Sequence, residues 1–428
     1  MEIGKLTEWN PWWENKALVK ELAGKPRQSY ALLEKSIAIK EITIITGVRR
    51  SGKSTIMYQM IQNLLQQRIE PKQILFVNFE DKKLAQDSLD NVYASYRENM
   101  NPDKKAYVFL DEIHKKEGWE SWVRKQYDLK ADCKFVISGS CSHLLKKEYS
   151  TLLTGRNLTF ELFPLSFKEY LGFSGIEPEE ASVKKGIVLP ATKAKILSSL
   201  KSYLVQGGFP EAFFKEEQFK MKLLEQYFDD IIYKDIIDRF GLNSKRVMDF
   251  ALFLATNFTG TFSLRNVRNA LKLSYDAAKD YISHFSEAFL FFPIDHFSYS
   301  FKEQKTLPSK VYCIDNGLRN AVSFKFSEDI GKLAENIVCI ELKRRAKEVY
   351  YWKNKGEVDF IVKEKDRTLE AINVCYGEDI NERETKALKE YKAEFKEKVK
   401  SLIVITKDIE KEEEGIKFIP LWKWLLIP

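Results

Sequence analysis

The stretch Gly47-Val-Arg-Arg-Ser-Gly52-Lys53-Ser54 determines how the first part of the chain is interpreted. It follows the apolar run EITIIT (41–46) and precedes the helical pattern STIMYQMIQNLLQQ (54–67). Glycines let the backbone N–H groups of such a loop curl around phosphate oxygens, and the N-terminus of the following helix adds positive potential. The spacing GxxxxGK[ST], between a strand and a helix, therefore predicts a phosphate-binding loop.

The polar residues of this loop have expected roles. Lys53 would reach the β and γ phosphates, and the hydroxyl of Ser54 can ligate Mg²⁺. We therefore expect ATP and Mg²⁺ as cofactors. The nucleotide-binding residues that we predict are Gly47, Arg50, Ser51, Gly52, Lys53, Ser54 and Thr55.

A second apolar run, AYVFLDE (106–112), ends in two carboxylates. A buried parallel strand would place Asp111 at the edge of the sheet, beside the loop. We expect Asp111 to hold the metal through water, together with Ser54, and Glu112 to polarise the attacking water as a catalytic residue.

Four further residues are candidates for a role in the same reaction. Ser140, in the turn SGSCS (138–142), could orient the catalytic water, and its alternative is an ordinary Ser/Gly turn. Arg156 could stabilise transition-state charge in a neighbouring subunit, and its alternative is a surface salt bridge. Asn78 and Glu80, after the second predicted strand, could sense the γ-phosphate.

The first half of the chain alternates short apolar runs with amphipathic segments. This pattern is typical of a parallel α/β sheet with helices on both faces. The predicted strands are EITIIT (41–46), QILFVNF (73–79), AYVFLDE (106–112), CKFVISG (133–139) and LTFELF (158–163).

Composition and charge exclude several classes of protein. The chain has 428 residues with 44% hydrophobic residues, and 69 basic against 62 acidic residues give a net charge of +7. This mild excess permits nucleic-acid binding but does not indicate it. Five scattered cysteines argue against a disulfide framework and a zinc site. Since no 18-residue apolar window exists, we expect no membrane span and a cytoplasmic location.

Taken together, the motifs resemble the prokaryotic AAA+-type ATPases that carry an added C-terminal domain of formerly unknown function. The resemblance spans nearly the whole chain. Its motifs are GVRRSGKST (47–55), NFED (78–81), FLDEIH (109–114), ISGSCSHLL (137–145), LTGR (153–156), LFPLSFKEY (162–170), LVQGGFPEA (204–212), KVYCIDNGLR (310–319), KLAENIVCIEL (332–342) and YYWKNKGEVDFIV (350–362).

The resemblance implies an AAA+ core with a helical lid, a winged helix and a restriction-endonuclease-like C-terminal domain. It also implies that Gly207–Pro210 lies at the lid turn, facing the nucleotide, where related ATPases often have an arginine that this chain lacks. The domains that we predict are an N-terminal helical segment (1–40), the P-loop core (41–165), the lid (166–240), the winged helix (241–305) and the nuclease-like domain (306–428).

The C-terminal nuclease-like site is predicted to be degenerate. Such a site needs an Asp on one strand and Glu-x-Lys on the next, and Asp359 fits the first position while Glu335 could join from a helix. Asn373 and Cys375 occupy the places of the Glu and the Lys. Shifting the register to Glu370 does not restore the lysine either, so we expect no nuclease activity.

Two functions remain open at this stage. Basic residues on the predicted winged helix, Arg265, Arg268, Lys272 and Lys279, could contact DNA phosphates, although Asp276 and Asp280 oppose such contact. The leading hypothesis is an ATP-driven homo-oligomeric motor or switch that acts on DNA. The alternative is a signalling or tethering ATPase whose added domains bind a protein partner.

Overall fold

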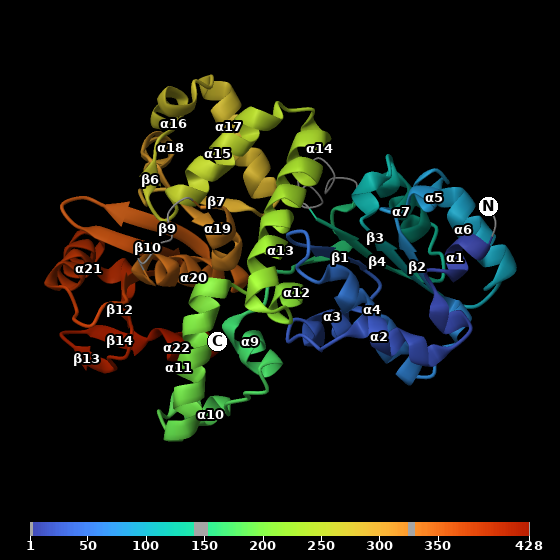
Figure 1. Ribbon diagram of the computed structural model, residues 1–428, viewed down its shortest axis with the longest axis horizontal. Coiled ribbons are helices and arrows are strands. Elements are labelled where there is room, and N and C mark those ends of the chain that lie inside the picture. Colours follow the sequence, from blue (N-terminus) through green and yellow to red (C-terminus); the bar gives the residue numbers. More distant parts are fainter. Residues whose placement is uncertain (1–2, 141–152, 324–329, 428) are drawn as a thin grey trace. The chain divides into compact units, whose positions relative to one another are not determined.

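The computed structural model describes residues 3–140, 153–323 and 330–427, and the chain divides into two compact units, 1–162 and 163–428 (Figure 1). Each unit is described by itself. Cys141 and Ser142 of the predicted SGSCS turn lie outside the described residues.

Unit 1 is built on a five-stranded parallel sheet in the order β2-β3-β4-β1-β5. The strands are β1 (Ile42–Thr46), β2 (Ile74–Asn78), β3 (Ala106–Asp111), β4 (Cys133–Gly139) and β5 (Asn157–Glu161). All five coincide with the apolar runs of the sequence, which confirms the predicted parallel α/β core. The helices are α1 (Gly4–Thr7), η1 (Pro11–Trp13), η2 (Lys16–Leu18), α2 (Val19–Ala23), α3 (Tyr30–Ser36), α4 (Lys53–Gln66), η3 (Pro71–Gln73), α5 (Lys82–Ala85), α6 (Leu89–Asn99), η4 (Ile113–Lys115) and α7 (Trp119–Asp128).

Both faces of this sheet are buried. On β1, Ile45 packs toward α4 while Ile44 packs toward α6 and α7, because successive strand side chains point to opposite faces. The N-terminal segment covers the edge strand β2: the Asn10 side chain donates to the Phe76 carbonyl at 2.8 Å and accepts from the Phe76 N–H at 2.7 Å. An exposed strand edge is thereby closed.

Unit 2 begins with helices. A capping box between Ser166 and Glu169, as expected from the sequence, opens the first of them. The helices are α9 (Phe167–Phe173), α10 (Glu180–Lys184), α11 (Pro190–Gln206), α12 (Pro210–Phe213), α13 (Glu217–Asp230), the π-helix η6 (Ile231–Ile237) and α14 (Asp238–Phe240).

A group of three helices and a three-stranded antiparallel sheet follows. The helices are α15 (Ser244–Thr256), α16 (Leu264–Leu271) and α17 (Tyr275–Glu287), and α18 (Phe301–Thr306) lies between the last two strands. The sheet has the order β6-β8-β7, from β6 (Thr261–Phe262), β7 (Phe291–Ile294) and β8 (Ser309–Cys313). The predicted nuclease-like domain (306–428) includes residues 309–313, whereas in the structure they pair with β7 and β6.

The last part of the chain forms a six-stranded mixed sheet in the order β13-β14-β12-β11-β10-β9. Its strands are β9 (Glu348–Lys353), β10 (Glu357–Lys363), β11 (Leu369–Cys375), β12 (Val399–Thr406), β13 (Lys411–Glu413) and β14 (Ile416–Pro420). The helices α20 (Ile330–Arg344) and α22 (Leu421–Leu426) pack on one face and α21 (Glu382–Phe395) on the other. The remaining helices are α19 (Asn316–Val322) and η7 (Lys396–Lys398).

A buried polar network explains three of the sequence motifs in unit 2. The Asp315 carboxylate accepts the N–H of Gly208 at 2.6 Å, and a Cβ on Gly207 would lie 2.0 Å from its Oδ1. Asn316 donates to the Leu204 carbonyl, and the Asn336 amide donates to the Asn316 side chain. The motifs at 204–212, 310–319 and 332–342 therefore meet here. The expected position of the turn Gly207–Pro210 toward the nucleotide involves both units and stays a prediction.

Over the described residues, the search for membrane-spanning segments finds no helix with both the length and the apolar character that a bilayer crossing requires.

Candidate functional site

The phosphate-binding loop stands where the sequence predicts it, between the carboxyl end of β1 and the first turn of α4. Gly52 caps α4 with φ +98°. Gly47 has φ +148°, and a Cβ there would lie 2.1 Å from the Leu162 carbonyl oxygen. Both conformations suit glycine, since L side chains rarely adopt positive φ. Ser51 is buried, Arg50 is exposed with φ +67°, and Thr55 lies in the first turn of α4.

The Lys53 side chain is buried inside the phosphate-binding loop. Its ammonium donates to the carbonyls of Gly47 at 3.1 Å and Val48 at 3.2 Å. A third partner is Glu112, whose Oε1 lies 3.6 Å from Nζ. The cation is therefore held within the curl of the loop, at the position that the motif predicts for contact with phosphate.

Ser54 and Asp111 are brought into direct contact. Ser54 Oγ donates to Asp111 Oδ2 at 2.6 Å, and Ser138 Oγ donates to the other carboxylate oxygen. Asn78 adds a longer contact to Asp111 Oδ2, at 3.4 Å. Burial, followed by the neighbouring Glu112 carboxylate, raises the pKa of Asp111 above its ordinary value. Side chains from β2, β4 and α4 thus converge on the Asp111 carboxylate at the end of β3.

Glu112 follows β3 with φ +52°, an unusual conformation for a residue with a side chain. Its Oε2 accepts the backbone N–H of Ser140 at 3.2 Å and lies 3.3 Å from His114 Nδ1. The backbone N–H of Ser140 therefore lies next to Glu112, and the expected role of Ser140 in orienting the catalytic water stays a prediction. Ser138 is the β4 side chain that touches Asp111.

These groups fit ATP with Mg²⁺. The backbone N–H groups of a loop with this spacing are the usual donors to phosphate oxygens, and Lys53 supplies the cation. A hydroxyl and a carboxylate 2.6 Å apart are the oxygen ligands that Mg²⁺ takes beside a substrate phosphate. The fit rests on residues from four different elements that the fold brings to one edge of the sheet.

Comparison with known proteins places the chain in a family. The uncharacterized protein MJ1544 of Methanocaldococcus jannaschii is 32% identical over 429 residues, covering 95% of this chain and 93% of that protein. The chain belongs to the same family. An uncharacterized protein of Haemophilus influenzae is 31% identical over 413 residues, covering 94% of this chain and 98% of that protein.

The family models agree with the site in unit 1. An AAA domain matches residues 39–171, and this match confirms the predicted AAA-type P-loop ATPase core. Two models described as domains of unknown function, DUF8612 and DUF4143, match residues 197–329 and 330–424.

Solved structures resemble the chain only distantly. The Aeropyrum pernix ORC1 protein in complex with DNA has 12% identity, covers 70% of this chain and 91% of that chain, and has a TM-score of 0.32. C. elegans PCH-2 has 15% identity, covers 62% and 68%, and has a TM-score of 0.24. At these TM-scores the two structures do not bear on function.

Arg156 lies at the edge of the sheet opposite to its own phosphate-binding loop. It precedes β5, whose first residue Asn157 pairs with Ile42 at the start of β1, whereas the loop follows the end of β1. The length of β1 separates these edges by roughly 15 Å. Within its own chain, the Arg156 guanidinium pairs with Asp128 at 2.8 Å.

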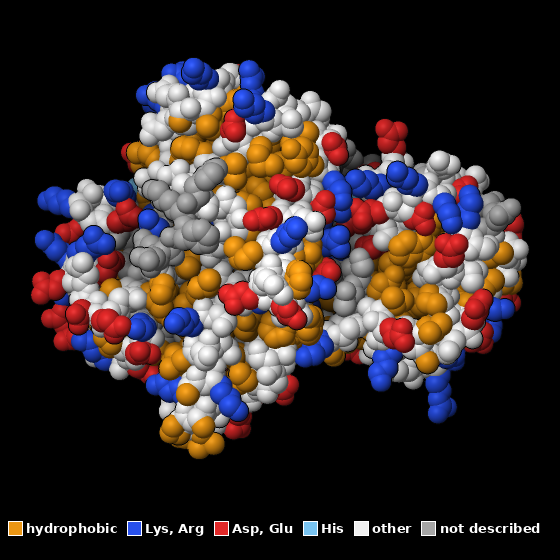
Figure 2. Space-filling model, viewed as in Figure 1, with side chains coloured by type: hydrophobic (Ala, Val, Ile, Leu, Met, Phe, Trp, Pro, Cys, Tyr) orange, Lys and Arg blue, Asp and Glu red, His pale blue; other side chains and the backbone are white. Residues whose placement is uncertain are grey.

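The four predicted DNA-binding cations lie on or beside α16 and α17. All four side chains are exposed, and the structure gives none of these side chains an ion pair or hydrogen bond with another described residue. Figure 2 shows Lys and Arg side chains projecting at the end of unit 2 where Figure 1 places these helices. The residues are Arg265, Arg268, Lys272 and Lys279.

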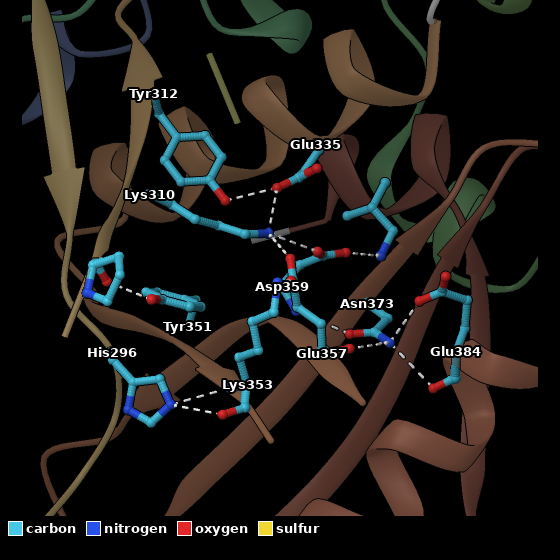
Figure 3. A network of polar contacts seen from close by, with 12 residues as sticks. His296, Lys310, Tyr312, Glu335, Tyr351, Lys353, Glu357, Asp359, Asn373 and Glu384 are labelled. Atoms are coloured by element: carbon cyan, nitrogen blue, oxygen red, sulfur yellow. Dashed lines mark hydrogen bonds and ion pairs between the residues drawn. The ribbon is translucent and has the colours of Figure 1, made fainter. Parts of the chain in front are cut away.

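The predicted degenerate nuclease site is brought together in part. Glu335 and Asp359 lie on either side of a buried lysine, Lys310, which sequence reasoning missed (Figure 3). Asn373 accepts the Asp359 backbone N–H at 3.0 Å and donates to Glu384 Oε2 at 2.8 Å.

Cys375 is not part of this cluster. Its Sγ contacts the Asp379 carbonyl at 3.5 Å, and its side chain packs on the face of the sheet that α21 covers. The lysine was missed because it comes from β8, a strand of a different sheet. Its one signal in the sequence is the alternation of Lys310 and Tyr312, which places both side chains on one side of a strand.

Replacing Gly47 by alanine is expected to destabilise unit 1 by about 2–4 kcal/mol and to weaken ATP binding. The new Cβ would meet a backbone oxygen at 2.1 Å, and the positive φ adds strain. Gly118→Ala is the matched control, because Gly118 has φ +70° with nothing within 4 Å of an added Cβ. Thermal unfolding and ATP titration of both variants measure the difference; equal effects would contradict a role for the close approach.

Proposed function

We propose that this chain is a Mg²⁺-dependent ATPase that works as an oligomer and acts on DNA through unit 2. The single observation that carries the ATPase assignment is the 2.6 Å contact between Ser54 Oγ and Asp111 Oδ2, next to a loop with the buried Lys53. A P-loop ATPase needs this pair to hold Mg²⁺ and this lysine to bind phosphate.

The residues of the site have two kinds of role: some bind the phosphates and the metal, and one accepts a proton. The N–H groups of the loop and Lys53 bind the phosphates, and Ser54 and Asp111 would hold Mg²⁺, which neutralises phosphate charge when bound. Lys53 now faces Glu112 at 3.6 Å, so phosphate competes with that carboxylate for the ammonium. Glu112 can then accept the proton of the attacking water.

The position of Arg156 supports an oligomer. Its guanidinium lies too far from its own loop to contact the same nucleotide, yet it is 29% exposed and available to a neighbouring chain. An arginine supplied by a neighbour stabilises the charge that develops in phosphoryl transfer. We therefore infer that the complete active site forms between two copies of the chain.

Arg156→Ala is expected to lower ATP turnover by about 10³-fold while each chain still binds ATP. Asp128→Ala is the matched control, because it breaks the same ion pair but keeps the arginine. A surface salt bridge alone would make the two variants equal. Steady-state phosphate release and ATP titration separate these cases.

A mixing experiment tests the shared site directly. Arg156→Ala retains a binding-competent loop, whereas Lys53→Ala retains the arginine, so mixed oligomers contain some complete sites. Mixing the two inactive variants is expected to restore part of the turnover. A mixture as inactive as its components, or a strict monomer with full activity, would contradict the proposal.

DNA is the second part of the proposal, supported by the helices and sheet around α16. Three helices with a small antiparallel sheet, whose strand β6 comes between α15 and α16 and whose strands β7 and β8 follow α17, fit the plan of a winged helix. Cations that have no ion pair among the described residues can contact DNA phosphates without first breaking such a pair, and the contact releases counterions from the DNA. Asp276 and Asp280 are also exposed on α17 and oppose phosphate, which makes α16 the better candidate for contact.

The double variant Arg265→Ala/Arg268→Ala is expected to weaken duplex DNA binding by about tenfold. The slope of log affinity against log salt should become shallower by about 2, one unit for each lost phosphate contact. Lys195→Ala/Lys201→Ala, on the exposed side of α11, removes the same charge elsewhere and should leave both quantities unchanged. Binding is measured by fluorescence anisotropy at several salt concentrations.

The rival function is a signalling or tethering ATPase whose unit 2 binds a protein. The exposed aspartates of α17 are the observation in its favour. The test adds duplex, single-stranded and four-way DNA at low salt. If none of them binds to the protein or changes its ATP turnover, this alternative replaces the DNA proposal, and the ATPase assignment is unaffected.

A further inference from the structure

One lysine of unit 2 is surrounded by three carboxylates. The ammonium of Lys310, on β8, lies 3.1 Å from Glu335 on α20, 2.7 Å from Glu357 and 3.1 Å from Asp359 on β10 (Figure 3). A lysine ammonium has three N–H donors, so these contacts can use all of them.

The cluster is nearly removed from water. The Lys310 side chain is 3% exposed and those of Glu335 and Asp359 are 14% and 15% exposed, whereas Glu357, at the rim of the cluster, is 34% exposed. Burial alone would lower the pKa of Lys310, but Glu335, Asp359 and Glu357 together outweigh it and raise this pKa well above its ordinary value. The three surrounding carboxylates therefore favour the charged form of this lysine.

The carboxylates have further partners that hold their orientation. Asp359 Oδ2 accepts the Val374 N–H at 3.0 Å, and Tyr312 donates to Glu335 Oε1 at 2.7 Å. Glu357 Oε2 lies 2.9 Å from Lys353. Each of the three carboxylates thus has at least one contact in addition to the one with Lys310.

This arrangement differs from a working metal-dependent centre. Such a centre needs carboxylate oxygens open to the metal, and a lysine that can touch water or the scissile phosphate. Here the ammonium stands at the point where the carboxylates converge, and its burial excludes substrate. Its location on β8 also ties the three-stranded sheet to the C-terminal α/β fold, which fits a locking role better than a catalytic one.

We propose that Lys310 is a built-in cation that closes this carboxylate centre to divalent metal ions and locks strand β8 onto α20 and β10. The proposal goes beyond the ATPase function. It accounts for the presence of Glu335 and Asp359 without a nuclease reaction, because both carboxylates accept hydrogen bonds from the lysine and hold it in place.

The first test measures metal binding while Lys310 is in place. Equilibrium dialysis with Mn²⁺ compares the wild-type chain with Asp359→Asn, both without nucleotide. If the centre is closed, the two proteins take up equal Mn²⁺, because uptake at Ser54 and Asp111 is common to both. Loss of one bound Mn²⁺ in Asp359→Asn, or plasmid cleavage that Asp359→Asn abolishes, would overturn the proposal.

The second test removes the lysine. Lys310→Met leaves three carboxylates without their cation and is expected to lower the melting temperature by about 10 °C or to prevent folding. Lys305→Met is the matched control, because Lys305 is 57% exposed and forms a surface ion pair with Asp295 at 2.7 Å; its expected shift is under about 2 °C. Equal melting temperatures for the two variants would contradict the lock.

Divalent ions provide a final readout on the same variant. Once the ammonium is gone, Mn²⁺ should raise the melting temperature of Lys310→Met but not of Lys310→Met/Asp359→Asn. A wild-type protein that gains as much from Mn²⁺ as Lys310→Met does would show an open centre and overturn the proposal. If Lys310→Met does not fold while Lys305→Met does, the lock is supported and the dialysis experiment decides the question of metal exclusion.

Discussion

Replacing Glu112 by glutamine is expected to slow ATP hydrolysis by about 10²–10⁴-fold while ATP binding is retained. The amide keeps the size of the side chain and an oxygen that can accept the Ser140 N–H, which the carboxylate now accepts at 3.2 Å. What it loses is the ability to take a proton from water. Single-turnover phosphate release, with ATP titration alongside, measures the two properties separately.

The control for this variant is Glu120→Gln. Glu120 is 5% exposed and lies on α7 in the same unit, so it matches the burial and the charge change of the Glu112 substitution. Its turnover is expected to equal that of the wild type. A Glu112→Gln protein with unchanged turnover would remove Glu112 from the mechanism.

Replacing Lys53 by alanine is expected to weaken ATP binding by about 10²-fold or more. Lys53 is 4% exposed, and its ammonium donates to two loop carbonyls. The substitution therefore removes a buried cation that would contact the phosphates. Turnover at low ATP concentration should fall to background, and isothermal titration measures the affinity.

Lys134→Met is the matched control for the loss of a buried lysine. Lys134 lies near the start of β4, at the other edge of the sheet, where its ammonium donates to the Ile39 and Glu41 carbonyls. We expect this variant to be less stable but to bind ATP as the wild type does. Equal loss of ATP binding in both variants would indicate general unfolding and contradict the specific role of Lys53.

The sequence was sufficient for the sheet of unit 1 and the loop because both are local patterns. A fully buried parallel strand is an unbroken apolar run, and a phosphate-binding loop is a run of eight residues. The meeting of Ser54 with Asp111 could also be predicted, since the carboxyl ends of parallel strands share one edge.

Contacts that depend on tertiary packing could not be predicted in this way. Arg27, which donates to the Ser51 carbonyl at 2.7 Å, lies in a segment with no recognisable motif. His114 follows the carboxylate pair in sequence, but only the turn after β3 brings its ring to Glu112. An arginine or a histidine at such a position does not by itself distinguish a nucleotide site from an ordinary helix or turn.

Lys310 shows the same limit in unit 2. The run KVYCID reads as a strand, but a strand pattern does not say which sheet it joins. The sequence therefore placed it with the wrong sheet, and the lysine could not be linked to Asp359. Asn373 was expected in the place of a catalytic carboxylate, and the fold uses it instead to connect the Asp359 backbone with Glu384.

The most direct test of the central claim is phosphate release by the purified wild-type protein supplied with ATP, with Mg²⁺ and again with the metal chelated. The account predicts steady release with Mg²⁺ and release at background without it, since Ser54 and Asp111 are arranged to hold the ion beside the phosphates. ATP binding with no release under any Mg²⁺ condition, or release that chelation leaves unchanged, would contradict the assignment of this site as a Mg²⁺-dependent ATPase.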